Sequence, residues 1–155
     1  MGEMNFDLRS ALPLLLPKAI AWAEERADEV ILNGTPLSDQ GISIAQRAGV
    51  TSPHLIRIAM VDRLPVPSDP QLQQAALATG LLAPNMAGLT LGHSILVCHG
   101  QLTIRLLSHE CRHVFQYEQA GSIGAFLPLY LQQIVDHGYA NAPFEIDART
   151  HEVHA

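Results

Sequence analysis

The sequence predicts a single α+β domain covering residues 1–155, with helices at both ends and a small sheet between them. Of its 155 residues, 48% are hydrophobic and 15% are charged, a balance typical of a compact globular protein. Apolar residues recur at helical spacing in the first and last thirds of the chain. Residues typical of strands gather in two short stretches in the middle, which are too few for an alternating parallel α/β fold.

The first third predicts two helices. Pro17 suits the first turn of a helix, and apolar residues at helical spacing continue from there to the stop at Asn33-Gly34. A second, shorter helix fits Ser38 to Ala48, because Ser38 can cap its start and Gly49 can end it.

The middle third predicts two strands around a helix. Leu55 to Val61 is rich in Ile, Val and Met and is interpreted as a strand. Several prolines then require a loop, and Asp69 can cap a helix from Pro70 to Thr79. Gly88 to Cys98 is interpreted as one further strand, after which Gly100 turns the chain.

The last third predicts three helices. Leu102 to Ala120 contains no Pro or Gly and ends at Gly121, and its apolar stripe consists of Leu107, Cys111, Val114 and Phe115. A helix over about Ser122 to Asp136 follows, although it contains Pro128. A final helix covers about Pro143 to Val153.

The most informative motif is His109-Glu110-Cys111-Arg112-His113, an H-E-x-x-H sequence inside the helix over Leu102 to Ala120. Residues four apart lie on one face of a helix, so His109 and His113 can bind one metal ion together. Glu110 is turned by about 100° around the axis, where it can reach a metal-bound water as general base. The pattern indicates a zinc site and hydrolytic chemistry.

Catalytic zinc sites use three protein ligands, so a third must come from elsewhere in the chain. Eight downstream residues are candidates: Glu118, Asp136, His137, Glu145, Asp147, His151, Glu152 and His154. Glu145 is preferred because Pro143 can open its helix and the small Ala148, one turn along, allows another helix to approach closely. His137 is the alternative ligand. A metal role for Cys98 with His99 is a weaker alternative.

The motif followed by Val114 and Gln116, together with the Pro-x-Glu-x-x-Ala core within Tyr139 to Arg149, resembles the gluzincin clan of zinc metallopeptidases. The similarity covers about residues 93–149 and is strongest to small, single-domain bacterial members. It implies a minimal zincin-like fold with a three-stranded sheet, a motif helix, a glutamate helix and an edge strand over the cleft. It also implies His109, His113 and Glu145 as zinc ligands, with Glu110 as the base.

The chain departs from the gluzincin pattern in two respects. Many gluzincins carry an Asp four residues after the ligand Glu, which orients a ligand His, and Arg149 stands there in this sequence. The C-terminal subdomain that supplies a transition-state stabiliser in large gluzincins has no counterpart. Tyr139 and His151 are the preferred substitutes, with Tyr117 and Tyr130 as further candidates. The strand over Gly88 to Cys98 would hold an extended peptide, with His93 and Ser94 on it.

Charge and cysteine content limit the partners and location. The formal net charge is −6 with nine Lys and Arg, which disfavours nucleic acid. Two cysteines are too few for a disulfide scaffold, so we expect reduced thiols and a cytoplasmic protein. No apolar run approaches the length of a membrane span. The oligomeric state is not predicted.

The sequence therefore predicts a zinc metallopeptidase that acts on a peptide or protein substrate. The alternative is a zinc-stabilised binding module without hydrolysis, which the small size favours and the presence of Glu110 disfavours. A third interpretation is a membrane-surface protein that uses the apolar stretches 12–16 and 126–131. Core packing explains both stretches better.

Overall fold

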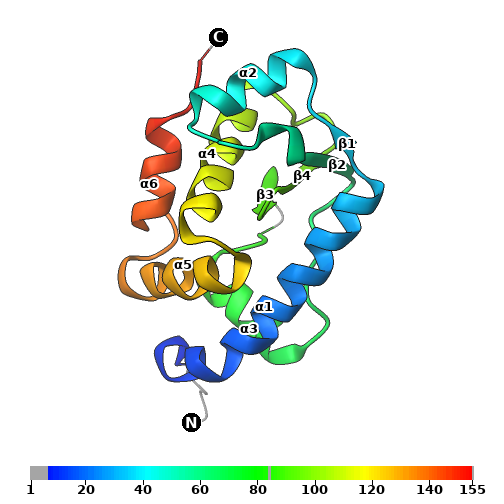
Figure 1. The fold of residues 1–155 in the computed structure, drawn as a ribbon. Helices are drawn as coiled ribbons and strands as arrows, with labels where there is room; N and C mark the ends of the chain where they lie inside the picture. The colour runs from blue at the N-terminus through cyan, green and yellow to red at the C-terminus, as the bar shows by residue number, and fades with distance from the viewer. Residues whose placement is uncertain (1–6, 84, 155) are drawn as a thin grey trace.

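A computed structural model describes residues 7–83 and 85–154 and shows a mixed α+β domain, as the sequence predicts (Figure 1). The helices are α1 (Leu8–Asn33), α2 (Asp39–Arg47), α3 (Pro70–Thr79), α4 (Ile104–Ala120), α5 (Ile123–His137) and α6 (Pro143–Thr150), with a 3-10 turn at Pro53–Leu55. The strands are β1 (Thr35–Pro36), β2 (Arg57–Val61), β3 (Gly88–Leu91) and β4 (Ser94–Cys98). Helix α6 lies beside α4, and α5 crosses below both (Figure 1).

The sheet has four strands in the order β1-β2-β4-β3, not the three that the gluzincin resemblance implies. Strand β2 is parallel to β4, whereas β1 and β3 pair antiparallel with β2 and β4. The expectation of one strand over Gly88 to Cys98 was wrong. That segment is a hairpin, because Gly92 adopts a φ of +68° and turns the chain at Gly92-His93.

The hairpin changes which strand forms the edge of the sheet. β4 is central and β3 is the edge, so Ser94 lies on a buried inner strand. The Cys98 N–H donates to Ala87 O at 2.9 Å, so Ala87 bonds to β4 through its backbone. In an antiparallel pair, every second residue bonds to the partner strand, and the backbone groups of the residues between them point away. The backbone groups of Gly88 and Thr90 therefore point away from β4, towards the free edge.

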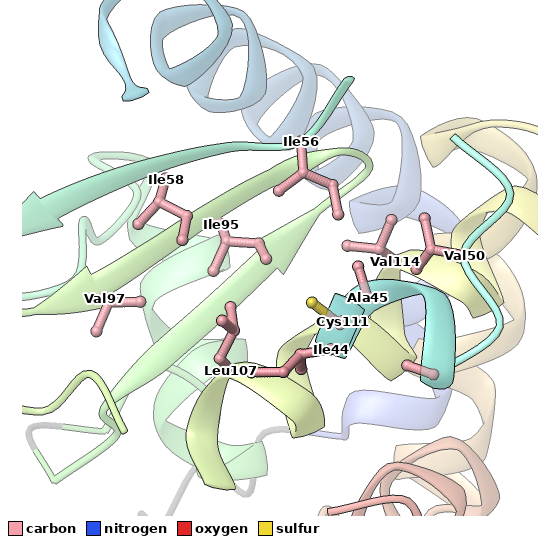
Figure 2. Close-up of a cluster of buried hydrophobic side chains, with 11 residues drawn as sticks. Ile44, Ala45, Val50, Ile56, Ile58, Ile95, Val97, Leu107, Cys111 and Val114 are labelled. Carbon is pink, nitrogen blue, oxygen red and sulfur yellow. The ribbon is translucent and has the colours of Figure 1, made fainter. Parts of the chain in front are cut away.

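Two hydrophobic clusters hold the sheet between helices. On one face Ile58, Ile95 and Val97 pack against α2 and α4, and Figure 2 shows their side chains meeting Leu107 and Cys111 of α4. On the other face Leu91 and Leu96 pack against α1 and α5 in a cluster that also contains Ala27 and Phe126. The stripe expected on the motif helix is confirmed, since Leu107, Cys111 and Val114 are buried and Phe115 packs against them. Burial raises the pKa of the Cys111 thiol to about 12, so that thiol stays protonated.

Helix α1 starts earlier than Pro17, so that predicted start was wrong. It begins at Leu8, where the Asp7 carboxylate accepts from the Ser10 N–H, and Pro13 and Pro17 lie inside it. Each proline removes one helical hydrogen bond, and the burial of apolar side chains on this added segment, Leu12 and Leu15, offsets the loss.

The other helix ends follow local signals. Asp69 caps α3 and Pro143 stands in the first turn of α6, both as expected. Gly121 ends α4 with a φ of +104°, and α5 continues through Pro128. Helix α6 ends at Thr150, three residues before the expected Val153. Within residues 7–83 and 85–154, no helix combines the length and apolar character that crossing a membrane requires.

Candidate metal centre

Three predicted ligand residues come together between α4 and α6. One ligand atom each from His109, His113 and Glu145 can be chosen so that all three lie within 4.8 Å of one another. His109 Nε2 is 3.3 Å from Glu145 Oε1, and His113 Nε2 is 3.0 Å from Glu145 Oε2. Tetrahedral zinc with bonds of about 2.0–2.1 Å needs ligand atoms roughly 3.4 Å apart, so the donor types and spacing fit zinc.

Local sequence explains how each helix presents its ligands. The i, i+4 spacing in α4 places the two imidazoles next to each other, with ring centroids 5.0 Å apart. In α6, Pro143 at the first turn starts the helix and Glu145 follows, 2% exposed. Ala148 is fully buried, which agrees with the expected close approach of the two helices.

Both imidazoles are oriented from behind by hydrogen bonds at Nδ1. His109 Nδ1 donates to Glu152 Oε2 at 2.8 Å, and His113 Nδ1 donates to Gln116 Oε1 at 2.8 Å. A neutral imidazole that donates from Nδ1 has a lone pair at Nε2, the atom that faces Glu145 in each ring. Without a metal, each Nε2 can carry a proton and donate to Glu145. When a metal displaces that proton, the Nδ1 hydrogen bonds leave both Nε2 lone pairs directed at the metal.

Glu152 supplies the orienting carboxylate that the sequence places in doubt. Arg149, at the position where many gluzincins carry an Asp, instead donates to Ala140 O. Glu152 reaches His109 from just beyond the end of α6, and Arg105 Nε donates to its other oxygen at 2.8 Å.

Further contacts hold α6 against α4. Arg112 donates from Nε to Asp147 Oδ2 at 2.8 Å and from Nη1 to Ala48 O at 2.8 Å. Gln116 Nε2 donates to Phe144 O and to Asp147 Oδ2, both at 2.9 Å. Gln116 thus contacts a ligand His with one end of its amide and the helix of the third ligand with the other.

The electrostatics of the three residues are coupled. Burial acts to raise the pKa of Glu145, but hydrogen bonds from His109 and His113 outweigh it and hold that pKa well below its ordinary range. Burial acts to lower the pKa of His113, and the Glu145 carboxylate reverses this and raises it to about 9. The pKa of His109 is raised in the same way. The negative carboxylate therefore attracts positive charge to this point, a property that suits a cation site.

Glu110 lies beside the three residues and is 5% exposed. Its Oε1 accepts a hydrogen bond of 2.8 Å from Thr90 Oγ1 on the edge strand β3. Gly88, two residues before Thr90, passes so close that a Cβ there would lie 3.1 Å from Glu110 Oε2. The edge strand therefore positions Glu110 as well as bordering the site.

Two tyrosines complete the polar end of the site. Tyr130 of α5 donates to Glu145 Oε2 at 2.7 Å. Burial raises the pKa of Tyr139, and the charges of Glu145 and Glu110 add to that rise. Burial likewise raises the pKa of Tyr130. Both hydroxyls therefore stay protonated and can donate. Tyr117 of α4 also lines the cavity described below, and its ring packs against Phe126 with centroids 3.9 Å apart.

A cavity of about 140 Å³ adjoins the centre. Glu110, His113, Tyr130, Tyr139 and Glu145 line its polar end. Both faces of β3 contribute, with Gly88 and Thr90 from one and Leu89 and Leu91 from the other, so the cavity runs past the outer edge of that strand. The rest of the wall is mostly apolar and comes from α1, α3, α5 and the loops on either side of α3, with Tyr117 from α4.

Several predicted site residues lie elsewhere. His93 stands in the hairpin turn and contacts Glu118 Oε2 at 2.9 Å, and Ser94 is fully buried with its hydroxyl donating to Ala27 O. His151 contacts the backbone of Asp147 and does not line the cavity. His137 is exposed at the end of α5. In the described part of the chain, neither Cys98 nor His99 belongs to a group of three metal-ligating side chains.

Three residues orient the site in ways that the sequence analysis did not predict: Thr90, Gln116 and Glu152. Glu152 was expected only as a candidate metal ligand. The spacing of Gln116 from His113, three residues along one helix, is a signal that could have found it. Thr90 and Glu152 come from distant segments, so only the tertiary structure reveals their roles.

Neither a protein-family model, nor a curated protein, nor a solved structure matched this chain in the three comparisons. The gluzincin resemblance stays a prediction from the motif residues.

Proposed function

We propose that this protein is a gluzincin-like zinc metallopeptidase, in which His109, His113 and Glu145 bind the metal and Glu110 is the general base. The observation that carries the proposal is the position of Glu110. It is buried beside the His₂Glu group and oriented by Thr90, but it is not among the three clustered ligand residues. A purely structural metal site needs no such carboxylate.

The surrounding residues support a hydrolytic mechanism. Zinc, when bound, lowers the pKa of water and polarises a carbonyl group. Glu110 takes the proton of the attacking water and passes it to the leaving amine. Tyr139 donates a hydrogen bond to the oxygen that gains negative charge.

The free edge of β3 supports an extended peptide as substrate. The outward backbone groups of Gly88 and Thr90 can pair with a peptide laid along β3, next to Glu110. The expected substrate strand was Gly88 to Cys98, and only its first part, β3, has a free edge.

The test combines metal analysis with hydrolysis of a peptide library. We expect one zinc per chain in the purified parent and in Glu110→Gln, because Gln is nearly isosteric with Glu. Hydrolysis by Glu110→Gln should fall by about a hundredfold or more, the range for loss of a general base. If the zinc-loaded parent cuts no peptide, the zinc-stabilised binding module replaces this proposal. The cytoplasmic location stays a prediction from the two cysteines.

A further inference from the structure

We propose that the apolar part of the cavity binds a long alkyl chain, which the substrate carries as an acyl group attached to a peptide. The binding of the chain follows from the cavity itself. The statement that the chain belongs to a substrate rests on the proposed function.

The wall of the cavity extends along α1, with residues of that helix from Leu8 to Ala23. Fifteen steps of 1.5 Å place the first and last of these residues roughly 22 Å apart along the helix axis. Helices α3 and α5 form the other sides over this stretch, with Leu72 and Leu131 among their contributions. A single buried side chain touches only about 6–12 residues, far fewer than this wall contains, so the space does not correspond to a pocket for one side chain.

The apolar part of the wall favours an alkyl chain over a peptide segment. Beyond the polar end and the edge of β3, the wall consists almost wholly of apolar side chains. Among the described residues, the exceptions include the indole N–H of Trp22 and the hydroxyl of Thr79, and the latter is already bonded to the backbone of its own helix at Ala75 and Ala76. A peptide backbone enclosed there would bury N–H and C=O groups without partners, which is costly. An alkyl chain has no polar groups to satisfy.

The polar end of the cavity suits the opposite part of such a molecule. The ionisable side chains of the described wall are Glu110, His113, Glu145 and three tyrosines, Tyr117, Tyr130 and Tyr139. The Glu110 charge acts on Tyr117 and Tyr139. The outer edge of β3 lies between the two parts, so a peptide paired with Gly88 and Thr90 could extend its acyl group into the apolar stretch. One acylated peptide would then match both the polar end and the apolar part of the cavity.

Chain binding can be measured on the metal-free protein, apart from any catalysis. A dansyl-labelled undecanoic acid reports binding by fluorescence, and hexanoate, decanoate and tetradecanoate displace it in competition. We expect affinity to rise with chain length by up to about fourfold for each methylene that becomes buried. An affinity that does not depend on chain length overturns the proposal.

A matched pair of variants on α3 locates the chain. Ala76 lines the cavity, whereas Gln74 is exposed and lines neither this cavity nor the hollow next to it. Ala76→Phe should reduce the affinity for tetradecanoate at least tenfold, whereas Gln74→Phe should leave it unchanged. Ala19→Leu, a smaller change in the opposite wall, keeps the test open if Ala76→Phe does not fold. Equal affinities in the parent and all folded variants would place the chain elsewhere and overturn the proposal.

Kinetics of the zinc-loaded protein test whether the bound alkyl chain is part of a substrate. One peptide sequence is compared with and without an N-terminal tetradecanoyl group, and kcat/KM should be at least tenfold higher for the acylated form. Equal kcat/KM values would show that the alkyl chain is not a substrate feature. If alkyl chains bind with the expected length dependence but neither peptide is cut, the proposed function fails and the alkyl site remains.

Discussion

The Nδ1 atom of His109 lies 2.8 Å from the Oε2 atom of Glu152, 43 residues further along the chain. Glu152 thereby orients a ligand of the motif helix from beyond the end of α6. We expect Glu152→Ala to reduce zinc affinity by about 10- to 100-fold, the usual cost of losing such a partner. Zinc titration against a competing chelator measures this, with the exposed Glu24→Ala as control. Equal zinc affinities in the parent and in Glu152→Ala would show that zinc binding does not depend on the orientation of His109 by Glu152.

Thr90 positions Glu110 through a hydrogen bond from its hydroxyl. The effect of this bond on the rate can be measured by removing the hydroxyl alone. Thr90→Val should keep zinc and lower kcat by about ten- to a hundredfold, because one hydrogen bond to a charged, buried group is lost. Thr90→Ser should restore most of the rate, since it keeps the hydroxyl. A rate loss in Thr90→Ser as large as in Thr90→Val would show that packing, not the hydrogen bond, is what Thr90 supplies.

Gly88 leaves room for Glu110, so a methyl group there should crowd the proposed general base. In Gly88→Ala the new Cβ would lie 3.1 Å from Glu110 Oε2 and push the carboxylate aside. We expect peptide hydrolysis to fall by about tenfold with zinc content unchanged. Gly124→Ala on α5 is the matched control, because its nearest neighbour atoms would be 3.9 Å away. Full activity in Gly88→Ala would contradict the close approach.

The two tyrosines at the polar end should have separate effects. Tyr130→Phe removes a hydrogen bond to Glu145 and should weaken zinc binding by several-fold. Tyr139→Phe should retain zinc and KM but lower kcat by about a hundredfold, because in the proposed mechanism its hydroxyl acts on charge that develops during the reaction. Steady-state kinetics with metal analysis separate the two variants. An unchanged kcat in Tyr139→Phe would exclude Tyr139 as the stabiliser.

Glu118 makes folding stability depend on pH. Burial acts to raise the pKa of its carboxyl, but hydrogen bonds from Thr51, His93 and the Ser52 N–H outweigh this and lower it. A carboxyl with a lowered pKa in the folded state contributes stability above its unfolded pKa of about 4.3, and that contribution is lost as pH falls through the folded value.

The corresponding variant is Glu118→Gln, with denaturant unfolding measured from pH 7 to pH 3. At pH 7 we expect it to be about 1–2 kcal/mol less stable than the parent, because amide groups make weaker hydrogen bonds. The difference should shrink below about pH 4 as the parent carboxyl is protonated. A difference that stays constant over this range would show that the Glu118 charge does not contribute.

Much of the fold could be predicted from short-range signals. Asp69 with Pro70, Pro143 and Gly121 mark helix ends by local backbone chemistry, and the structure agrees at each. The positions of His109 and His113 follow from helix geometry alone. The choice of Glu145 needed only a helix start and a small residue one turn later, and the structure brings its carboxylate to the two imidazoles.

The remaining features depend on contacts between distant segments. Pro17 is compatible with a helix start, but α1 extends back to Leu8 because Leu12 and Leu15 find a buried surface that the sequence does not reveal. The apolar residues from Gly88 to Cys98 have the composition of one long strand, and only the backbone at Gly92 divides it into two. The partners of His93 and Glu152 likewise depend on which segments meet.

The two-residue turn at Gly92-His93 fixes the register that places Thr90 beside Glu110, the proposed general base. Strand side chains alternate between faces, so a slip of one residue would exchange Thr90 for a leucine next to Glu110. Lengthening this turn by a single residue would therefore remove the hydrogen bond that orients Glu110. The turn itself does not line the cavity, and the three predicted ligand residues would be unchanged. A search for inactive variants should include this turn, although it contains none of the residues that perform the chemistry.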